Sequence, residues 1–333
     1  MQAMKKCGRT RKLDLQRIVV LGVAIVLAAI FSIASKEFRQ YTTIVTLFDS
    51  FYYFAFMSIG VTFCLISGGN DLSVGTGMVC YAMIAGMLAK DFGFPVWSCM
   101  LVALLLGLLF GALNGIMVAI MNLPAFIATL CTMLITRGLS SVACGGASIS
   151  WPARSTPEGW FRTIFKYMMP NALGKKTPIP TGLIVVLAAI IIMSIILNKT
   201  RIGRYIIAIG SNKESARLSG VNVVKYQMLA YIISGLFAGI AGIAFASSNS
   251  SSITAASGLG LELDAIGGAI IGGTSMTGGS GSIIGSMIGV LILALLKNGL
   301  PKIGLTGDWQ HVITGVILIV AIWFDVIRNR KKA

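Results

Sequence analysis

From Asn198 to Lys225 the sequence reads NKTRIGRYIIAIGSNKESARLSGVNVVK, and strongly apolar segments lie on both sides of this stretch. The stretch contains six basic residues and a single acid, Glu214. A basic loop between membrane spans lies in the cytoplasm, so this loop sets the orientation of the whole chain.

Within this loop, residues 211–219 predict a short helix. Ser211 is expected as its N-cap, Glu214 follows three residues later, and Gly220 is expected to end it. A short capped helix between two spans suits a rigid surface against which a partner protein presses. The alternative is a basic connector held at anionic lipid headgroups. The local sequence is compatible with both.

The composition excludes a soluble protein. Of 333 residues, 56% are hydrophobic and only 11% are charged, whereas soluble domains carry about 25% charged residues. The net charge of +16 comes from basic residues at span ends and in loops. Topology and contact with anionic lipid explain this charge, so no nucleic-acid partner is expected.

No catalytic or metal-binding pattern is present in the sequence. The six cysteines are scattered without metal-ligand spacing, and the chain has a single histidine. It contains neither a hydrolase motif nor a phosphate-binding loop. We therefore expect no catalytic residues, no metal and no cofactor on this chain, and any ATP that drives it must be bound by another subunit.

Apolar runs predict an all-α polytopic membrane protein with about ten transmembrane helices, some of them interrupted by glycine. Residues 1–333 are expected to form one membrane domain with both termini in the cytoplasm, because basic residues precede the first span and follow the last. The first span is expected to be retained rather than removed as a signal peptide. The expected spans are residues 17–34, 44–66, 77–89, 95–121, 123–143, 181–197, 226–246, 261–271, 281–296 and 309–327.

Residues 145–180 are expected to form a periplasmic segment, because they follow an odd number of spans. Five basic residues in this segment run against the positive-inside tendency. We expect interfacial helices, with tryptophans at headgroup level, to account for them.

Two glycine-rich stretches interrupt the apolar pattern, GGNDLSVGTG at 68–77 and GGTSMTGGSG at 272–281. They share glycines at four places and hydroxyl groups at two, and each precedes an apolar helix. Duplicated halves with such breaks are typical of transporters, where the breaks mark the substrate route. Two ordinary turns between hairpin helices are the alternative. Elsewhere, glycines spaced by four, as at 107, 111 and 115, predict close helix packing within one subunit or between two.

The polar residues near these breaks are largely neutral, which suits an uncharged polyhydroxylated solute better than an ion. Ionisable residues such as Asp71 lie near predicted span ends, within reach of water, and no paired intramembrane acids indicate ion coupling. The candidate substrate path comprises Asn70, Asp71, Ser73, Asn114, Thr129, Thr274 and Ser275.

Four stretches, in order along the chain, carry a resemblance to a known family. They are ISGGNDLSVGT at 66–76; Asn114-Gly with LPAFIATL at 123–130; NKTRIG at 198–203 with AIGSN at 208–212 and ARLSGVNV at 216–223; and ELDAI at 262–266 with GGTS at 272–275 and NGL at 298–300. The chain resembles the permease subunits of bacterial ATP-binding-cassette (ABC) importers for sugars, of the ribose, galactose and autoinducer-2 type. It departs from the family pattern at Asn70, where an apolar residue is usual.

The resemblance implies a multi-pass protein of the bacterial inner membrane that imports a sugar. Its implied partners are a cytoplasmic ABC ATPase that binds ATP and Mg²⁺, a periplasmic sugar-binding protein, and a second permease copy or a paralogue with which it forms a dimer. Membrane lipid surrounds it. The ATPase would dock on the loop at 199–225, where the family's coupling helix corresponds to Glu214, Ala216 and Gly220. Gly210 and Asn212 belong to the same implied coupling loop.

Two other functions remain open at this stage. An ATP-independent secondary carrier for a small neutral solute would continue to transport when ATP is depleted. A membrane-embedded enzyme acting on lipid or isoprenoid would need paired intramembrane acids or a His/Asp cluster, which this sequence lacks.

Overall fold

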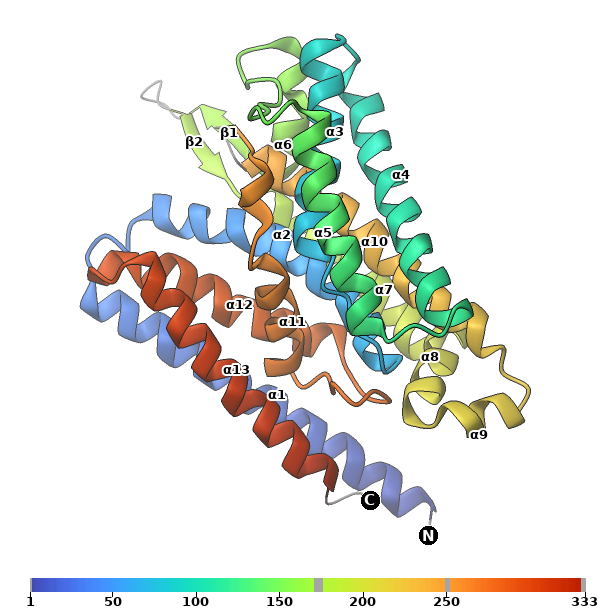
Figure 1. The fold of residues 1–333 in the computed structure, drawn as a ribbon. Helices are drawn as coiled ribbons and strands as arrows, with labels where there is room; N and C mark the ends of the chain where they lie inside the picture. The colour runs from blue at the N-terminus through green and yellow to red at the C-terminus, as the bar shows by residue number, and fades with distance from the viewer. Residues whose placement is uncertain (1, 171–175, 249–251, 331–333) are drawn as a thin grey trace.

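The computed structural model describes residues 2–170, 176–248 and 252–330, and most of these residues are helical (Figure 1). The helices are α1 (Gln2–Ala34), α2 (Tyr41–Ile66), α3 (Val74–Asp91), α4 (Val96–Gly115), α5 (Ala125–Ala143), α6 (Arg162–Phe165), α7 (Gly182–Lys199), α8 (Arg201–Ser211), α9 (Lys213–Leu218), α10 (Val223–Ser248), α11 (Leu261–Ile271), α12 (Ile283–Gly299) and α13 (Gly307–Arg330). Shorter elements are a π-helical turn at Ile116–Ile120, 3₁₀ turns at Pro157–Phe161, Ala255–Gly258 and Pro301–Ile303, and a hairpin of β1 (Tyr167–Pro170) and β2 (Lys176–Ile179).

Seven helices within the described residues are long and apolar enough to span a membrane, which makes the chain an all-helical polytopic membrane protein. They are Arg17–Ala34, Tyr41–Ile66, Val96–Ile120, Ala125–Ala143, Gly182–Lys199, Val223–Ser248 and Ile283–Ile303. The predicted count of ten is not confirmed. Three predicted spans fall on α3, α11 and α13, and α11, at 11 residues, would cross only about half of a bilayer.

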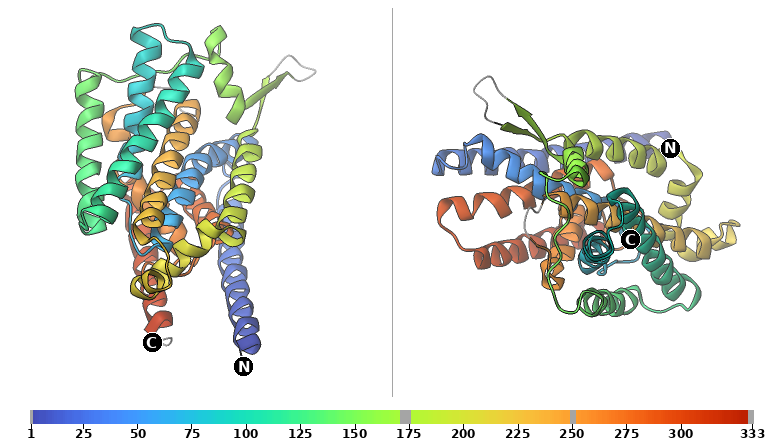
Figure 2. Two further views of the ribbon diagram at one scale, coloured as in Figure 1. Left: turned by 90° about the vertical axis from the view of Figure 1, so that its right-hand side faces the viewer. Right: turned by 90° about the horizontal axis from the view of Figure 1, so that it is seen from above.

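The core of the bundle is built around α2 and α10, which pack against each other and against α4 and α12. Of the most apolar window of α2, 72% is buried, whereas the corresponding share for α1 is 11%. Helices that are apolar but exposed all along one side are those that face lipid. Figure 2 shows α1 at the edge of the bundle, in keeping with this difference.

Glycines let helices α4 and α10 come into backbone contact. A Cβ atom on Gly111 would lie 2.6 Å from the carbonyl oxygen of Tyr231, and one on Gly239 would lie 2.8 Å from that of Ala103. Any side chain at these positions would push the helices apart. The glycine spacing noted in the sequence therefore serves packing within one subunit.

The two ends of the bundle differ in character. Both Figure 1 and Figure 2 show the start of α1 and the end of α13 at one end, with α8 and α9 toward the same end, and the β1–β2 hairpin at the other. We call these the α9 end and the hairpin end.

The segment that precedes α7 is tied firmly to the hairpin end of the bundle. Arg162 is buried and donates to the carbonyl oxygens of Pro152 (2.8 Å), Ser247 (3.1 Å) and Trp151 (3.2 Å). Lys166 forms an ion pair with Asp49 of α2. Burial lowers the pKa of the Arg162 guanidinium, and the nearby charge of Arg154 lowers it further.

These contacts correct the expectation for residues 145–180. The segment contains short helical turns and a β-hairpin rather than interfacial helices alone. Trp151 is buried and donates from Nε1 to the carbonyl oxygen of Ala82 (2.9 Å), whereas Trp160 is exposed. Arg162 and Lys166 both make internal contacts, so neither charge is free at the surface of this segment.

Candidate functional site

The basic loop folds into two helices, α8 and α9, joined at a sharp bend. Asn212 has an extended backbone between them (φ −162°), and its Oδ1 accepts a hydrogen bond from the backbone nitrogen of Ser215 (2.9 Å). Asn212 is therefore the N-cap of α9. The prediction of Ser211 as the N-cap is wrong, because Ser211 is the last residue of α8 and its Oγ donates to the carbonyl oxygen of Ile207 (2.9 Å).

One face of α9 is anchored and the other is exposed. Ala216 is buried in a small apolar cluster with Ile209 of α8 and Val223 of α10. Leu218, by contrast, is 79% exposed at the tip of the helix. Gly220 has a positive φ of 79° and ends the turn as the sequence predicts. α9 therefore packs one side against the bundle and leaves the side that carries Leu218 exposed.

Charged side chains flank this leucine. Glu214 and Arg217 are exposed and form an ion pair at 2.8 Å. A pocket of about 420 Å³ separates α9 from the end of the π-helical turn that follows α4. Its walls are Ala119, Ile120, Asn122, Lys213, Glu214, Arg217, Val223 and Val224.

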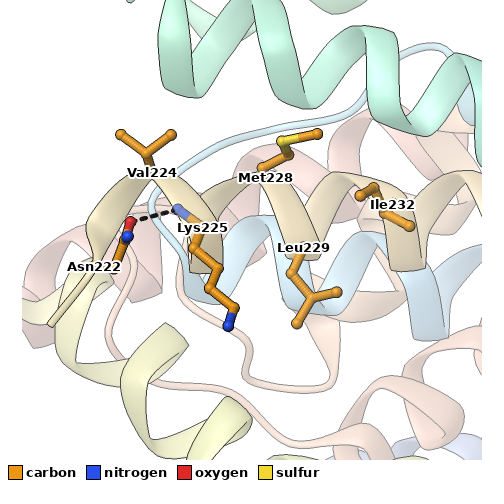
Figure 3. Close-up of a pocket in the computed structure, with 6 residues that line it drawn as sticks. All are labelled: Asn222, Val224, Lys225, Met228, Leu229 and Ile232. Atoms are coloured by element: carbon orange, nitrogen blue, oxygen red, sulfur yellow. Dashed lines mark hydrogen bonds between the residues drawn. The ribbon is translucent and has the colours of Figure 1, made fainter.

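A second pocket, of about 510 Å³, lies beside the first turns of α10 (Figure 3). Apolar side chains line it, with Asn222 and Lys225 at the start of the helix. Figure 3 shows the hydrogen bond by which Asn222 Oδ1 accepts from the backbone nitrogen of Lys225 (2.9 Å) and caps α10. Both pockets are at the α9 end, and only the first of them is lined by residues of α9.

Deeper in the bundle, the chain between α2 and α3 carries a buried carboxylate. Asp71 is 1% exposed. Its Oδ1 accepts from the backbone nitrogen (3.0 Å) and Oγ (2.6 Å) of Ser73, and its Oδ2 accepts from Ser234 Oγ of α10 (2.7 Å). Asn114 of α4 donates to Ser73 Oγ (2.9 Å) and accepts from Thr132 Oγ1 of α5 (2.6 Å). We call these five residues the Asp71 cluster.

The Asp71 cluster corrects the expectation that this acid lies near a span end within reach of water. Both carboxylate oxygens have donors, which is the condition under which a polar group can be buried at acceptable cost. The cluster also joins one interrupted segment to three helices at a single point, so it fixes the path of the chain where α3 begins.

A second group of hydroxyls lies at the other glycine-rich break. Ser286 Oγ of α12 is 2.8 Å from Thr62 Oγ1 of α2 and 3.2 Å from Thr274 Oγ1. All three side chains are buried. We call them the Thr274 cluster. It contains hydroxyl groups alone, which can donate or accept and so match the hydroxyls of a neutral solute.

The structure therefore divides the predicted substrate path. Asn70 adjoins the Asp71 cluster, because its Oδ1 accepts from the backbone nitrogen of Asp71 (2.9 Å). Ser275 lies beside Thr274, and its Oγ is 2.9 Å from Thr277 Oγ1 within the same turn. Thr129 joins neither cluster: it is buried and bonds to the carbonyl oxygen of Ala125 in its own helix (2.9 Å).

Sequence reasoning missed the partners that complete the two clusters. They are Thr62, Thr132, Ser234 and Ser286, each a hydroxyl inside an apolar helix. Their position opposite the breaks depends on the packing of distant helices. No group of three or more His, Cys, Asp or Glu side chains that could hold a metal occurs in the part of the chain that the structure describes.

Comparison with known proteins gives consistent matches along the chain. Residues 43–322 match the family model described as the permease component of branched-chain amino acid transport systems. The chain is 36% identical over 312 residues to the ribose import permease protein RbsC of Escherichia coli K12, with 92% of each chain covered. It is 30% identical to the fructose import permease protein FruG of Bifidobacterium longum, covering 93% of this chain and 91% of that protein.

A third relative is the xylose transport system permease protein XylH of Escherichia coli K12, which is 32% identical, with 83% of this chain and 82% of that protein covered. No solved structure matches the chain. The family match covers most of the chain, and the relatives are matched over most of their own length. The chain belongs to this family of membrane transport permeases.

Proposed function

We propose that this chain is the membrane-spanning permease subunit of an ATP-driven ABC importer that moves a sugar or a related polyhydroxylated solute across the bacterial inner membrane. The observation that carries the proposal is α9, a capped helix anchored by Ala216 that presents Leu218 to solvent. Held on one side and exposed on the other, with the Glu214–Arg217 ion pair beside Leu218, α9 offers a fixed contact surface to a partner protein.

The solute class follows from the relatives and from the buried clusters. The curated relatives are named as import or transport permeases for ribose, fructose and xylose. The family description names branched-chain amino acids instead. The Asp71 and Thr274 clusters supply mostly hydroxyl and amide groups, which can exchange their mutual hydrogen bonds for those of a sugar. Asn70, Asp71, Ser73, Asn114, Thr274 and Ser275 remain our candidates for the substrate path; Thr129, which bonds within its own helix, is the weakest of the seven.

The proposed topology places the α9 end in the cytoplasm and the hairpin end in the periplasm. The basic residues of the loop at 199–225 support this orientation. The seven long helices span the membrane, and α3, α11 and α13 are the further membrane-embedded segments that complete about ten.

The proposed assembly has four kinds of component. A cytoplasmic ABC ATPase, which holds ATP and Mg²⁺, docks on α9 around Asn212, Glu214, Ala216 and Gly220, while Gly210 of the same predicted loop packs in α8 against the backbone of Ile66 and Gly279. A periplasmic sugar-binding protein delivers solute at the hairpin end. A second copy of the permease, or a paralogue, completes the pore, and membrane lipid covers the exposed apolar faces. Hydrolysis takes place on the ATPase, and this chain is not itself an enzyme.

The test is co-purification of the tagged permease from native membrane in mild detergent, followed by reconstitution in proteoliposomes with the proteins that accompany it. We expect an ATPase to co-purify, and we expect ATP to drive uptake of ribose, fructose or xylose. A permease that transports a sugar after ATP depletion and without an ATPase would show that the chain is a secondary carrier. Uptake of leucine or valine in place of the three sugars would overturn the assignment of the solute.

A further inference from the structure

Three segments far apart in the sequence are in direct backbone contact, at glycine residues, at the α9 end. They are the residues that follow α2, the last turn of α8, and the second glycine-rich stretch. Gly279 donates from its backbone nitrogen to the carbonyl oxygen of Ile66 (2.9 Å). Gly68, Gly210 and Gly278 lie around this bond. We call Gly68, Gly210, Gly278 and Gly279 the glycine junction.

The junction leaves no room for a side chain at Gly210, Gly278 or Gly279. A Cβ atom on Gly210 would overlap the carbonyl oxygen of Ile66 and lie 2.6 Å from the nitrogen of Gly279. One on Gly278 would lie 2.7 Å from the carbonyl oxygen of Gly210 and 3.0 Å from the Cα of Gly68. Gly68, Gly278 and Gly279 have φ values of 84°, 88° and 70°, which other residues adopt only with strain.

The junction is directly continuous with α9. Gly210 and Ser211 form the end of α8, and only Asn212 separates them from the first residue of α9. The Cα of Ser211 itself lies against Gly279, at 2.8 Å from where a Cβ would be. A displacement of α9 therefore acts on the end of α8, and the end of α8 is in contact with both glycine-rich breaks.

Each break leads in turn to one of the buried polar clusters. The chain after Gly68 carries Asp71 and Ser73, and the stretch that contains Gly278 carries Thr274. Contacts made by backbone alone have no flexible side chain to absorb a movement, and close-packed interiors transmit displacement rather than deform.

We propose that the glycine junction is the route by which ATPase docking is coupled to the substrate path, with Gly210 as its positioning residue. The inference rests on the proposed function, since it takes α9 as the ATPase dock. In this proposal, the two glycine-rich stretches at 68–77 and 272–281 move together and carry the coupling. The alternative route runs straight from α9 into α10 through Ala216 and Val223 and leaves the breaks unaffected.

A pair of alanine variants tests the role of Gly210. Gly210→Ala places a methyl group inside the junction, and Gly138→Ala, in α5, places one where nothing lies within 4 Å. We expect the Gly210→Ala complex to bind the co-purified ATPase and to hydrolyse ATP, but to lose about 5- to 150-fold in sugar uptake per ATP, the range of typical coupling energies. Gly138→Ala should match the wild type. Unchanged uptake per ATP in a folded Gly210→Ala complex would overturn the proposal.

Hydrogen exchange on the wild-type complex decides the question even if Gly210→Ala does not fold. The full permease–ATPase complex is compared with and without a non-hydrolysable ATP analogue. We expect exchange to change at residues 66–70 and 276–281 together with 212–220. A change at 212–220 and in α10 with none at the two breaks would overturn the junction and leave the dock intact. Failure of the wild-type permease to bind any ATPase would overturn the proposed function itself, and the junction's role with it.

Discussion

Truncation of Leu218 to alanine should weaken ATPase binding while leaving the permease folded. Full burial of a leucine side chain contributes about 1.5–3 kcal/mol. The permease leaves 79% of this residue exposed, so most of that contribution is available to a partner and little of it to the fold. The expected loss is about 1–2 kcal/mol of binding free energy, or an affinity about 5- to 30-fold weaker.

The assay is a titration of the co-purified ATPase into permease held in lipid nanodiscs, with the dissociation constant as the readout. Val142→Ala is the matched control, because Val142 is an aliphatic side chain that is 80% exposed at the end of α5. It should bind the ATPase as the wild type does, and the thermal unfolding of both variants should match the wild type. Equal ATPase affinity in all three proteins would refute the reasoning that α9 presents Leu218 as a binding contact.

Three further predictions follow from the described contacts. Ser234→Ala removes the donor to Asp71 Oδ2 (2.7 Å) and should cost about 1–3 kcal/mol of unfolding free energy, measured by thermal denaturation in detergent. Arg162→Lys should also destabilise the permease, because a lysine cannot reach the three carbonyl oxygens at once and each hydrogen bond to a charged group contributes about 1.5–3 kcal/mol. For sidedness, an impermeant maleimide should label Trp160→Cys in intact cells whose outer membrane is permeabilised, and should label Leu218→Cys only in inverted vesicles.

Each of these predictions has a control in the same chain. Ser219→Ala removes an exposed hydroxyl that bonds within its own turn, and Arg201→Lys keeps the charge at an exposed position, so both should unfold as the wild type does. Wild-type stability in Ser234→Ala or Arg162→Lys would show that the corresponding contacts contribute nothing. Labelling of both cysteines from the same side would contradict the proposed orientation.

Local signals in the sequence predicted the long helices well. The first span was expected at 17–34, and the apolar part of α1 is Arg17–Ala34; the second was expected at 44–66, and α2 is Tyr41–Ile66. Hydropathy works here because a membrane-spanning helix satisfies its own backbone, so its length and composition suffice to define it. The predicted count of ten membrane spans is not confirmed, because some helices, such as α3 and α11, are short or carry charged residues at one end.

Contacts between distant residues could not be predicted in the same way. Asp71 was expected near water, and it is buried because Ser234 supplies a donor from 163 positions away. The pairing of β1 with β2 and the hydrogen bonds made by Arg162 likewise depend on segments that meet only in three dimensions. A single sequence shows that a hydroxyl or a guanidinium is present, but the partner that determines its role is set by packing.

The two glycine-rich stretches show where sequence similarity and structural role separate. In the alignment that suggested a duplication, Gly68 matches Gly272 and Gly75 matches Gly279. Gly68 lies in the junction with a positive φ, whereas Gly272 packs against Gly285 of α12 with a helical φ of −70°. Gly75 lies against the start of α11, whereas Gly279 bonds to the end of α2.

Glycines at matching positions of the two stretches therefore make different contacts. This difference favours two separate turns over two copies of one element. The two stretches lie at the same place in the fold, but residues at matching sequence positions do not have matching structural roles. Both bring a helix break to the end of α8, and the backbone there tolerates only glycine. If α9 is the ATPase dock, one movement of that helix reaches both breaks, and this arrangement does not require the halves of the chain to be copies of each other.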